Sequence, residues 1–264
     1  MRSRPCLKTN FVQICLPLVR GSIICKVMAI RFTHLLLVLL VDQVKCVYDK
    51  ADPLKLSTDP LKLHYFPVKA RGFLAELALR QAGLPYERVY PKDWMALKPT
   101  MPFGQLPVLE GGGIGKLAQS MAIARFAAHI GGMEPNEPAA WAKSEMLIEE
   151  QNDIYDEMRN AKASKDDSAY DQFFETRAPT HLKYLDALLD SDDGTPYFGM
   201  ELTLGDLAIF SVFNIMRDLK PTVLDPFPKL LTFYSAVAEL PAIADYLAKE
   251  MPPAYFQLPT KKEL

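Results

Sequence analysis

The chain has 264 residues, of which 49% are hydrophobic, 10% aromatic and 23% charged, and this composition excludes disorder over most of its length. Its 30 Lys and Arg residues nearly balance 32 Asp and Glu residues, so the net charge of −2 lacks the basic surplus of a nucleic-acid-binding protein. All four cysteines lie within residues 1–46, which excludes disulfide, thiolate-metal and CxxC redox chemistry from the remainder. No metal site is expected, because the later histidines are isolated: His64, His129 and His181.

The first 41 residues carry six basic residues and no acidic one, so they differ from the acidic remainder. The apolar run 35–41 after Arg31 predicts a signal peptide over about residues 28–46, and it is shorter than a membrane span. The C-terminal Lys261–Leu264 differs at one position from the retrieval signal KDEL. We therefore expect residues 1–60 to be a poorly ordered leader directing the chain to the secretory pathway or ER lumen. An organelle presequence, or a misassigned start codon on a cytoplasmic protein, is the alternative.

Strand and helix patterns alternate after residue 60. Alternation over 61–66 predicts a strand, helical spacing over 72–82 predicts a helix, and 86–90 predicts a second strand. Two further strands flank a glycine-rich turn, and another helix follows. These last elements are expected at 106–109, 116–117 and 120–129. The mixture predicts a small sheet covered by helices.

A breaker cluster at residues 131–138 ends this region, and only helical patterns follow it. Thr203 and Asp206 have the spacing of a capping box at the start of one of these helices. The expected helices cover residues 140–162, 166–189, 203–217 and 228–249. We therefore predict an α/β domain over 61–133 and an all-helical domain over 134–264.

Three motifs carry a family resemblance: HYFPVKAR at 64–71, WMALKPTMPFGQLPVLE at 94–110 and LAQSMAIAR at 117–125. In this order and spacing they resemble the glutathione S-transferases, specifically the sigma class, over about residues 61–257. The resemblance implies an α+β thioredoxin-like N-terminal domain followed by an all-α C-terminal domain, usually assembled as a homodimer.

The chemistry of glutathione directs attention to Tyr65. The thiol of glutathione is largely protonated at neutral pH, so an enzyme that uses the thiolate must stabilise negative charge on sulfur. The resemblance gives this role to the tyrosine hydroxyl at Tyr65, which can donate a hydrogen bond to sulfur. Arg71 is expected to tune that hydroxyl electrostatically, unless it is only a solvated arginine at the start of a helix.

The resemblance also implies residues that hold glutathione. Pro107 is expected to follow a cis peptide bond, so that the backbone of Leu106 pairs with the cysteinyl unit like an added strand. Gln119 and Ser120 stand at a predicted helix start, where backbone amides and the helix dipole suit the γ-glutamyl carboxylate. The predicted binding set, with Tyr65 as its catalytic member, is Tyr65, Arg71, Trp94, Lys98, Gln105, Leu106, Pro107, Gln119, Ser120 and Asp153, of which Trp94 and Lys98 would contact the glycine end.

Two positions leave alternatives open. Asp153 matches an acidic residue that reaches the γ-glutamyl amine across the dimer, but it also lies on an acidic helix face that could be merely solvated. Residues 70–73 read Ala-Arg-Gly-Phe where the family commonly has Gly-Arg-Ala-Glu, and Glu76 is a candidate to replace the missing glutamate. The electrophile pocket, which varies within the family, is expected beside Tyr155, Met158 and Phe256.

The expected function is conjugation of the glutathione thiolate to small hydrophobic electrophiles in detoxification, with glutathione as co-substrate. A glutathione-dependent isomerase of prostaglandin D synthase type, or a peroxidase, is an alternative from the same site. A non-catalytic ligand carrier or crystallin-like structural protein is an alternative of another class.

Overall fold

The computed structural model describes residues 59–164, 166, 168–189, 194–249 and 252–254. The predicted leader up to residue 58, including the expected signal peptide at 28–46, lies outside the described residues, as does the KDEL-like Lys261–Leu264. Within the described ranges, no helix combines the length and the apolarity that crossing a membrane requires.

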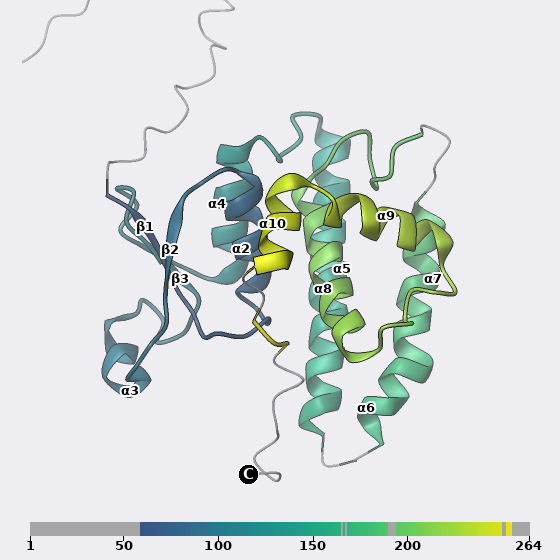
Figure 1. Ribbon diagram of the computed structural model, residues 1–264, viewed down its shortest axis with the longest axis horizontal. Helices are drawn as coiled ribbons and strands as arrows, with labels where there is room; N and C mark the ends of the chain where they lie inside the picture. The colour runs from purple at the N-terminus through teal and green to yellow at the C-terminus, as the bar shows by residue number, and fades with distance from the viewer. Residues whose placement is uncertain (1–58, 165, 167, 190–193, 250–251, 255–264) are drawn as a thin grey trace, which may run out of the picture. The chain divides into compact units, whose positions relative to one another are not determined.

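Four strands form one mixed sheet in the order β2-β1-β3-β4 (Figure 1). The central strand β1 (Leu61–His64) runs parallel to β2 (Tyr86–Val89) and antiparallel to β3 (Val108–Glu110). β3 in turn pairs antiparallel with β4 (Lys116–Ala118), so the predicted hairpin is confirmed.

The first strand is shorter than its sequence pattern, which extended to Phe66. Tyr65 still donates its backbone N–H to Val89 O at 3.2 Å, but β1 itself ends at His64. Pro67 has no N–H to donate, so the ladder cannot continue beyond this point. Tyr65 therefore lies at the start of the loop after β1.

Helices α2 (Phe73–Gln81) and α4 (Ser120–Gly131) pack against each other beside the sheet (Figure 1). Their apolar residues join the buried residues of β1 in the core. The short α3 (Trp94–Leu97) and the 3₁₀ turn η1 (Lys98–Thr100) lie at another edge of this domain, between β2 and β3 in the chain.

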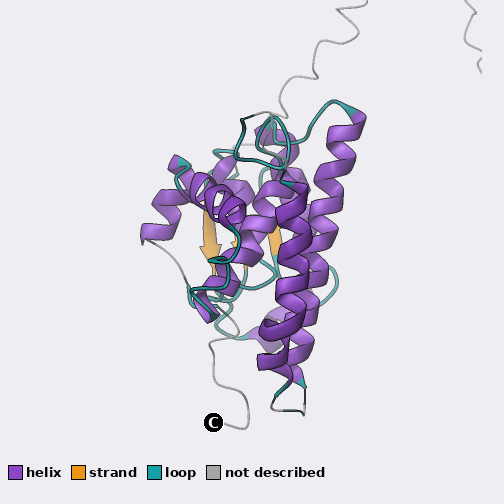
Figure 2. Cartoon of the chain, turned by 90° about the vertical axis from the view of Figure 1, so that its right-hand side faces the viewer, coloured by secondary structure: helices purple, strands orange, loops and turns teal. Residues whose placement is uncertain are grey.

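Among the described residues after 131, the regular elements are helices, and the longest of them lie in front of the sheet in the view of Figure 2. The long α5 packs along α8. The helices are α5 (Pro138–Ala163), α6 (Ala169–Gln172), a π-helical turn η2 (Phe173–Arg177), α7 (Ala178–Leu188), α8 (Leu204–Leu219), α9 (Pro228–Ala238) and α10 (Pro241–Lys249).

Two predictions of a single continuous helix were wrong. The pattern over 228–249 forms two helices, because Pro241 lacks an N–H and would break a continuous helix, whereas it fits at the first position of α10. The pattern over 166–189 contains the π-helical turn η2, which ends two residues before Pro179. Pro179 again removes one backbone donor from the helical ladder.

Helix α8 is buried along most of its length at the centre of the helical domain. Its predicted capping box is confirmed: Thr203 accepts from the backbone of Asp206, and Asp206 accepts from the backbone of Thr203. Gly205 allows α8 to approach α5 closely, since a Cβ there would lie 2.6 Å from the carbonyl oxygen of Ser144. The Gly205 N–H also donates to Ser144 Oγ at 3.0 Å.

An ion pair joins α5 to the segment that leads into α7. Arg177 donates through Nε to Glu157 at 2.9 Å, and His181 Nε2 lies 3.3 Å from the same carboxylate. The hydrogen bond from Arg177 is the main cause that holds the pKa of Glu157 below its ordinary value; His181 adds to this effect, whereas burial opposes it.

We expect Glu157→Gln to lower the free energy of unfolding by about 0.5–1 kcal/mol at pH 7, because the pair is partly exposed to solvent. A carboxylate whose folded pKa is lowered stabilises the fold above the unfolded pKa of about 4.3, and this contribution is lost as the pH falls. Urea unfolding of both proteins at pH 7 and pH 4 should therefore show the difference shrinking at pH 4. A difference that stays constant would show that charge on Glu157 does not stabilise the fold.

Candidate active site

Tyr65 opens the loop that connects β1 to α2, and the residue is 9% exposed. The ring packs directly on the backbone of Gly72, where a Cβ would lie only 2.5 Å from Tyr65 Cδ1. This contact gives a physical reason for one departure from the family pattern noted in the sequence. Glycine in place of alanine at position 72 leaves the space that the ring occupies.

The environment of Tyr65 keeps its hydroxyl protonated. Burial raises the pKa of Tyr65, while hydrogen bonding from the Gly72 backbone and the charge and backbone of Arg71 lower it. The nearby charge of Glu76 raises it further. Since the net direction is upward from about 10, the phenol remains a hydrogen-bond donor at neutral pH.

Arg71 is attached to the helical domain. Its guanidinium lies 5.0 Å from the centre of the Tyr155 ring and forms an ion pair with the carboxylate of Asp156, both on α5. Arg71 therefore has partners on α5, while 39% of its side chain remains exposed. Asp156 lies on the same helix as Asp153, and the sequence did not identify it as the partner of Arg71.

The carboxylate of Glu76 is occupied by residues outside the predicted binding set. It is buried and accepts from Arg88 through both oxygens, with Nε at 2.7 Å and Nη2 at 2.8 Å, and it also accepts from the hydroxyl of Tyr246. These contacts join α2, β2 and α10. Glu76 thus serves the packing of three elements and does not replace the missing glutamate of the family motif.

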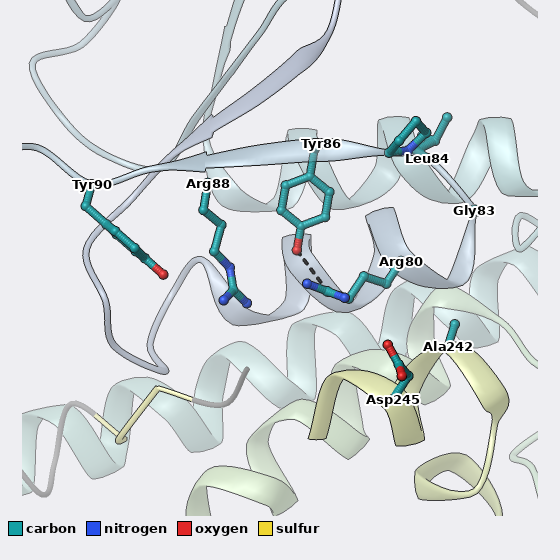
Figure 3. Close-up of a pocket in the computed structure, with 9 residues that line it drawn as sticks. Arg80, Gly83, Leu84, Tyr86, Arg88, Tyr90, Ala242 and Asp245 are labelled. Carbon is teal, nitrogen blue, oxygen red and sulfur yellow. Dashed lines mark hydrogen bonds between the residues drawn. The ribbon is translucent and has the colours of Figure 1, made fainter. Parts of the chain in front are cut away.

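A pocket of about 560 Å³ lies beside this cluster, between β2 and α10 (Figure 3). Arg80 donates through Nε to Tyr86 Oη at 3.1 Å there, and its guanidinium lies 4.4 Å from the centre of the Tyr246 ring. None of the predicted site residues lines this pocket. It stands at the C-terminal end of α2, whereas Arg71 precedes the N-terminal end.

A different and smaller pocket collects most of the predicted binding residues. Six of the ten predicted residues line it, together with Phe103 and Ala118. The peptide bond between Leu106 and Pro107 is cis, as the resemblance implied. The six residues are Arg71, Gln105, Leu106, Pro107, Gln119 and Ser120.

The N-terminus of α4 forms one wall of this pocket. Ser120 is its first residue and is buried, and Gln119 before it has a φ of 76°. Gln119 is the only non-glycine residue with a positive φ in the described part of the chain. Such a backbone conformation costs about 1–3 kcal/mol and is found most often where function requires it. The first amides of the helix and its dipole make this wall suitable for a carboxylate.

Four predicted residues lie outside the lining of the pocket: Tyr65, Trp94, Lys98 and Asp153. Trp94 meets Phe66 edge-on, with ring centres 5.8 Å apart, and Phe66 follows Tyr65 in the loop. The side chain of Lys98 packs near Gly104, one residue before Gln105 of the pocket wall. Asp153 is exposed on α5.

Two comparisons with known domains cover most of the described residues. Residues 59–129 match the glutathione S-transferase N-terminal domain, and residues 152–250 match its C-terminal domain. Hematopoietic prostaglandin D synthase of chicken (Gallus gallus) is 31% identical over 188 residues, covering 70% of this chain and 93% of that protein. The chain belongs to the glutathione S-transferase family.

Solved glutathione S-transferases share this fold. The crystal structure of the enzyme from Ascaris lumbricoides has 31% sequence identity and a TM-score of 0.63, covering 72% of this chain and 97% of that one. The Fasciola hepatica sigma class glutathione S-transferase has 29% identity and a TM-score of 0.65, covering 73% and 97%. The predicted thioredoxin-like domain followed by a helical domain is therefore confirmed.

Some features of this glutathione S-transferase fold were not predicted. Met158 is wholly buried in the core, so the expectation that it lines an open electrophile pocket was wrong. Tyr155 is buried beneath Arg71, and Phe256 lies outside the described residues. Phe103, which lines the pocket and is 65% exposed, was quoted within a motif but given no role.

Proposed function

We propose that this chain is a glutathione S-transferase that conjugates the thiolate of glutathione to hydrophobic electrophiles. The observation that carries the proposal is the buried, protonated Tyr65 in the loop that also supplies Arg71 to the pocket at the N-terminus of α4. The Tyr65 hydroxyl can then stabilise the charged sulfur of glutathione, while the residues of the pocket hold the rest of the tripeptide. Both domains of the family are present in the chain, in the family's order.

In the proposed reaction, glutathione binds with its γ-glutamyl carboxylate at the amides of Ser120 and its cysteinyl backbone paired with Leu106. The thiol of glutathione releases its proton to solvent, and the Tyr65 hydroxyl donates a hydrogen bond to the resulting thiolate, which favours the ionised form. The lone pair of that sulfur forms a bond to an electrophilic carbon, and the leaving group departs with the electron pair of the bond that breaks. The positive charge of Arg71 stabilises negative charge that develops near the Tyr65 hydroxyl.

The first experiment is a conjugation assay of the full chain with glutathione and 1-chloro-2,4-dinitrobenzene, which releases chloride on attack by the thiolate. A rate well above that of the uncatalysed reaction supports the proposal. Binding of glutathione without turnover of this or any other electrophile would favour the carrier or crystallin-like alternative.

We propose that the chain is of the sigma type, with an isomerase of prostaglandin D synthase type as the second candidate function. The sequence motifs support sigma, and the chicken relative named as a prostaglandin D synthase supports the second candidate. An isomerase would convert an endoperoxide without consuming glutathione, and a peroxidase would oxidise glutathione with an organic hydroperoxide. Product analysis with each substrate separates these reactions from conjugation.

We also propose that the protein is a homodimer, as the resemblance implies. Large apolar side chains that a single chain leaves exposed support this proposal, among them Phe103 and Trp141. In that assembly Asp153 would reach the γ-glutamyl amine of glutathione bound to the other copy. A stable monomer in sedimentation equilibrium would remove Asp153 from the proposed site.

The carboxylate contact can be tested through Ser120. We expect Ser120→Ala to weaken glutathione binding by roughly tenfold, because a hydrogen bond to a charged group is lost while the backbone amide remains. Calorimetric titration with glutathione measures the change, and Ser235→Ala on the exposed face of α9 is the matched control. Equal affinities for the wild type and Ser120→Ala would show that the carboxylate binds elsewhere.

A further inference from the structure

Lys69 is a buried lysine in the loop between Tyr65 and Arg71, and the proposed reaction does not use it. Only 3% of the residue is exposed. Its Nζ donates to Asn214 Oδ1 at 3.0 Å and forms an ion pair with the carboxylate of Asp218. Both partners are on α8, four residues apart, so they lie on one face of that helix.

The partners of Lys69 are themselves held in place. Asn214 is buried, and its Nδ2 donates to the hydroxyl of Tyr234 on α9 at 2.9 Å. The buried helix α8 is the central helix of its domain. The lysine is therefore anchored to the largely buried helix α8.

The backbone of Lys69 is attached as well. Its N–H donates to the carbonyl oxygen of Pro253 at 2.8 Å, and an isolated parallel bridge joins it to Ala254. The segment at 252–254 follows α10, so the middle of the loop is tied to two different parts of the C-terminal domain. The partly exposed pair between Arg71 and Asp156 is a third attachment, two residues further along the loop.

We propose that Lys69 is a positioning residue, which fixes the loop from Tyr65 to Gly72 against α8 and so places the Tyr65 hydroxyl and its backbone neighbours for ionisation of glutathione. The effect on ionisation of glutathione rests on the proposed transferase function. The attachment of the loop to α8 does not. Burial lowers the pKa of Lys69, whereas the hydrogen bond and charge of Asp218 raise it. The net direction is downward, so the ion pair with Asp218 opposes the cost of burying this lysine but does not cancel it.

The loop attached by Lys69 carries the backbone amides that act on the Tyr65 hydroxyl, and this gives Lys69 an indirect effect on catalysis. The amides of Arg71 and Gly72 act on Tyr65 and lower its pKa, and both are within three residues of Lys69. A loop that moves by about 1 Å misplaces these groups, and such shifts cost up to about a hundredfold in rate. The walls of the pocket formed by Gln119 and Ser120 lie at the start of α4, outside the loop that Lys69 attaches.

The test compares three variants of the full chain. Lys69→Met removes the charge while keeping a long side chain, and Asp218→Asn removes only the charge of the partner. Lys62→Met, at an exposed position of β1, is the matched control. Asp218→Asn keeps the test decisive should Lys69→Met fail to fold. Hydrogen exchange of the Arg71 and Gly72 amides is measured without glutathione, and the ionisation and affinity of bound glutathione are measured separately.

We expect the two amides to exchange at least about tenfold faster in Lys69→Met and Asp218→Asn, and to be unchanged in Lys62→Met. The ionisation constant of the bound thiol should fall by about tenfold, with glutathione affinity changed by less than about twofold. Unchanged amide exchange in both variants overturns the positioning role, whatever happens to activity. If the wild type binds glutathione without ionising it, the proposed function fails, and amide exchange still decides whether Lys69 holds the loop.

Discussion

We expect the Tyr65→Phe variant to bind glutathione with nearly unchanged affinity and to lose conjugating activity by roughly 10²–10³-fold in kcat, the effect of removing one donor to a developing charge. The ring is buried against Gly72, and phenylalanine keeps that packing while removing only the hydroxyl. The measurement is a pH titration of the ultraviolet absorbance of the bound thiolate, alongside kcat. In the wild type the thiolate should be present at neutral pH, and in the variant it should be absent.

Tyr184→Phe is the matched control, because Tyr184 is exposed on α7 and far along the chain from the site. It should leave the thiolate titration unchanged. If the Tyr65→Phe variant still ionises glutathione at neutral pH, a group other than Tyr65 stabilises the thiolate. Arg71 is then the next candidate, and Arg71→Met should abolish the thiolate in that case.

The order of strands and helices could be predicted because most elements carry their own periodicity. The hairpin of β3 and β4 follows from apolar strands around a glycine-rich turn, and α8 follows from a capping box before an apolar run. The errors occurred where proline acts inside a continuous pattern. Apolar spacing continued through Pro179 and Pro241, but a π-helical turn precedes the first proline and a helix break precedes the second, where each removes an N–H group.

The site could be predicted where the three sequence motifs contain residues that line one pocket. The pocket at the start of α4 collects six of them from α4 and from the loops before α2, β3 and α4. Contacts that depend on how the two domains pack could not be predicted. The partner of Arg71 is Asp156 and that of Lys69 is Asp218, about 85 and 150 residues away in the chain, and no local pattern links either pair.

A second large effect is expected at Asp206, this time on stability. Asp206 is fully buried, and its two oxygens accept from the backbone N–H of Phe198 at 2.9 Å, the backbone N–H of Thr203 at 2.8 Å and the hydroxyl of Thr203 at 2.7 Å. Asp206→Ala removes all three bonds at once and leaves buried donors without an acceptor. Because each unsatisfied buried donor costs about 1–3 kcal/mol, we expect a loss of about 3–5 kcal/mol in the free energy of unfolding.

Urea unfolding measures this loss, and thermal unfolding should show a fall in Tm of roughly 10 °C for a folded unit of this size. Glu137→Ala is the matched control, because Glu137 caps α5 through the N–H groups of Ala139 and Ala140 but is exposed to water. Water can replace the lost acceptor at the exposed start of α5, whereas the start of α8 is buried around Asp206. The Asp206 variant should therefore be much the less stable of the two, and equal losses would show that burial adds nothing to the capping interaction.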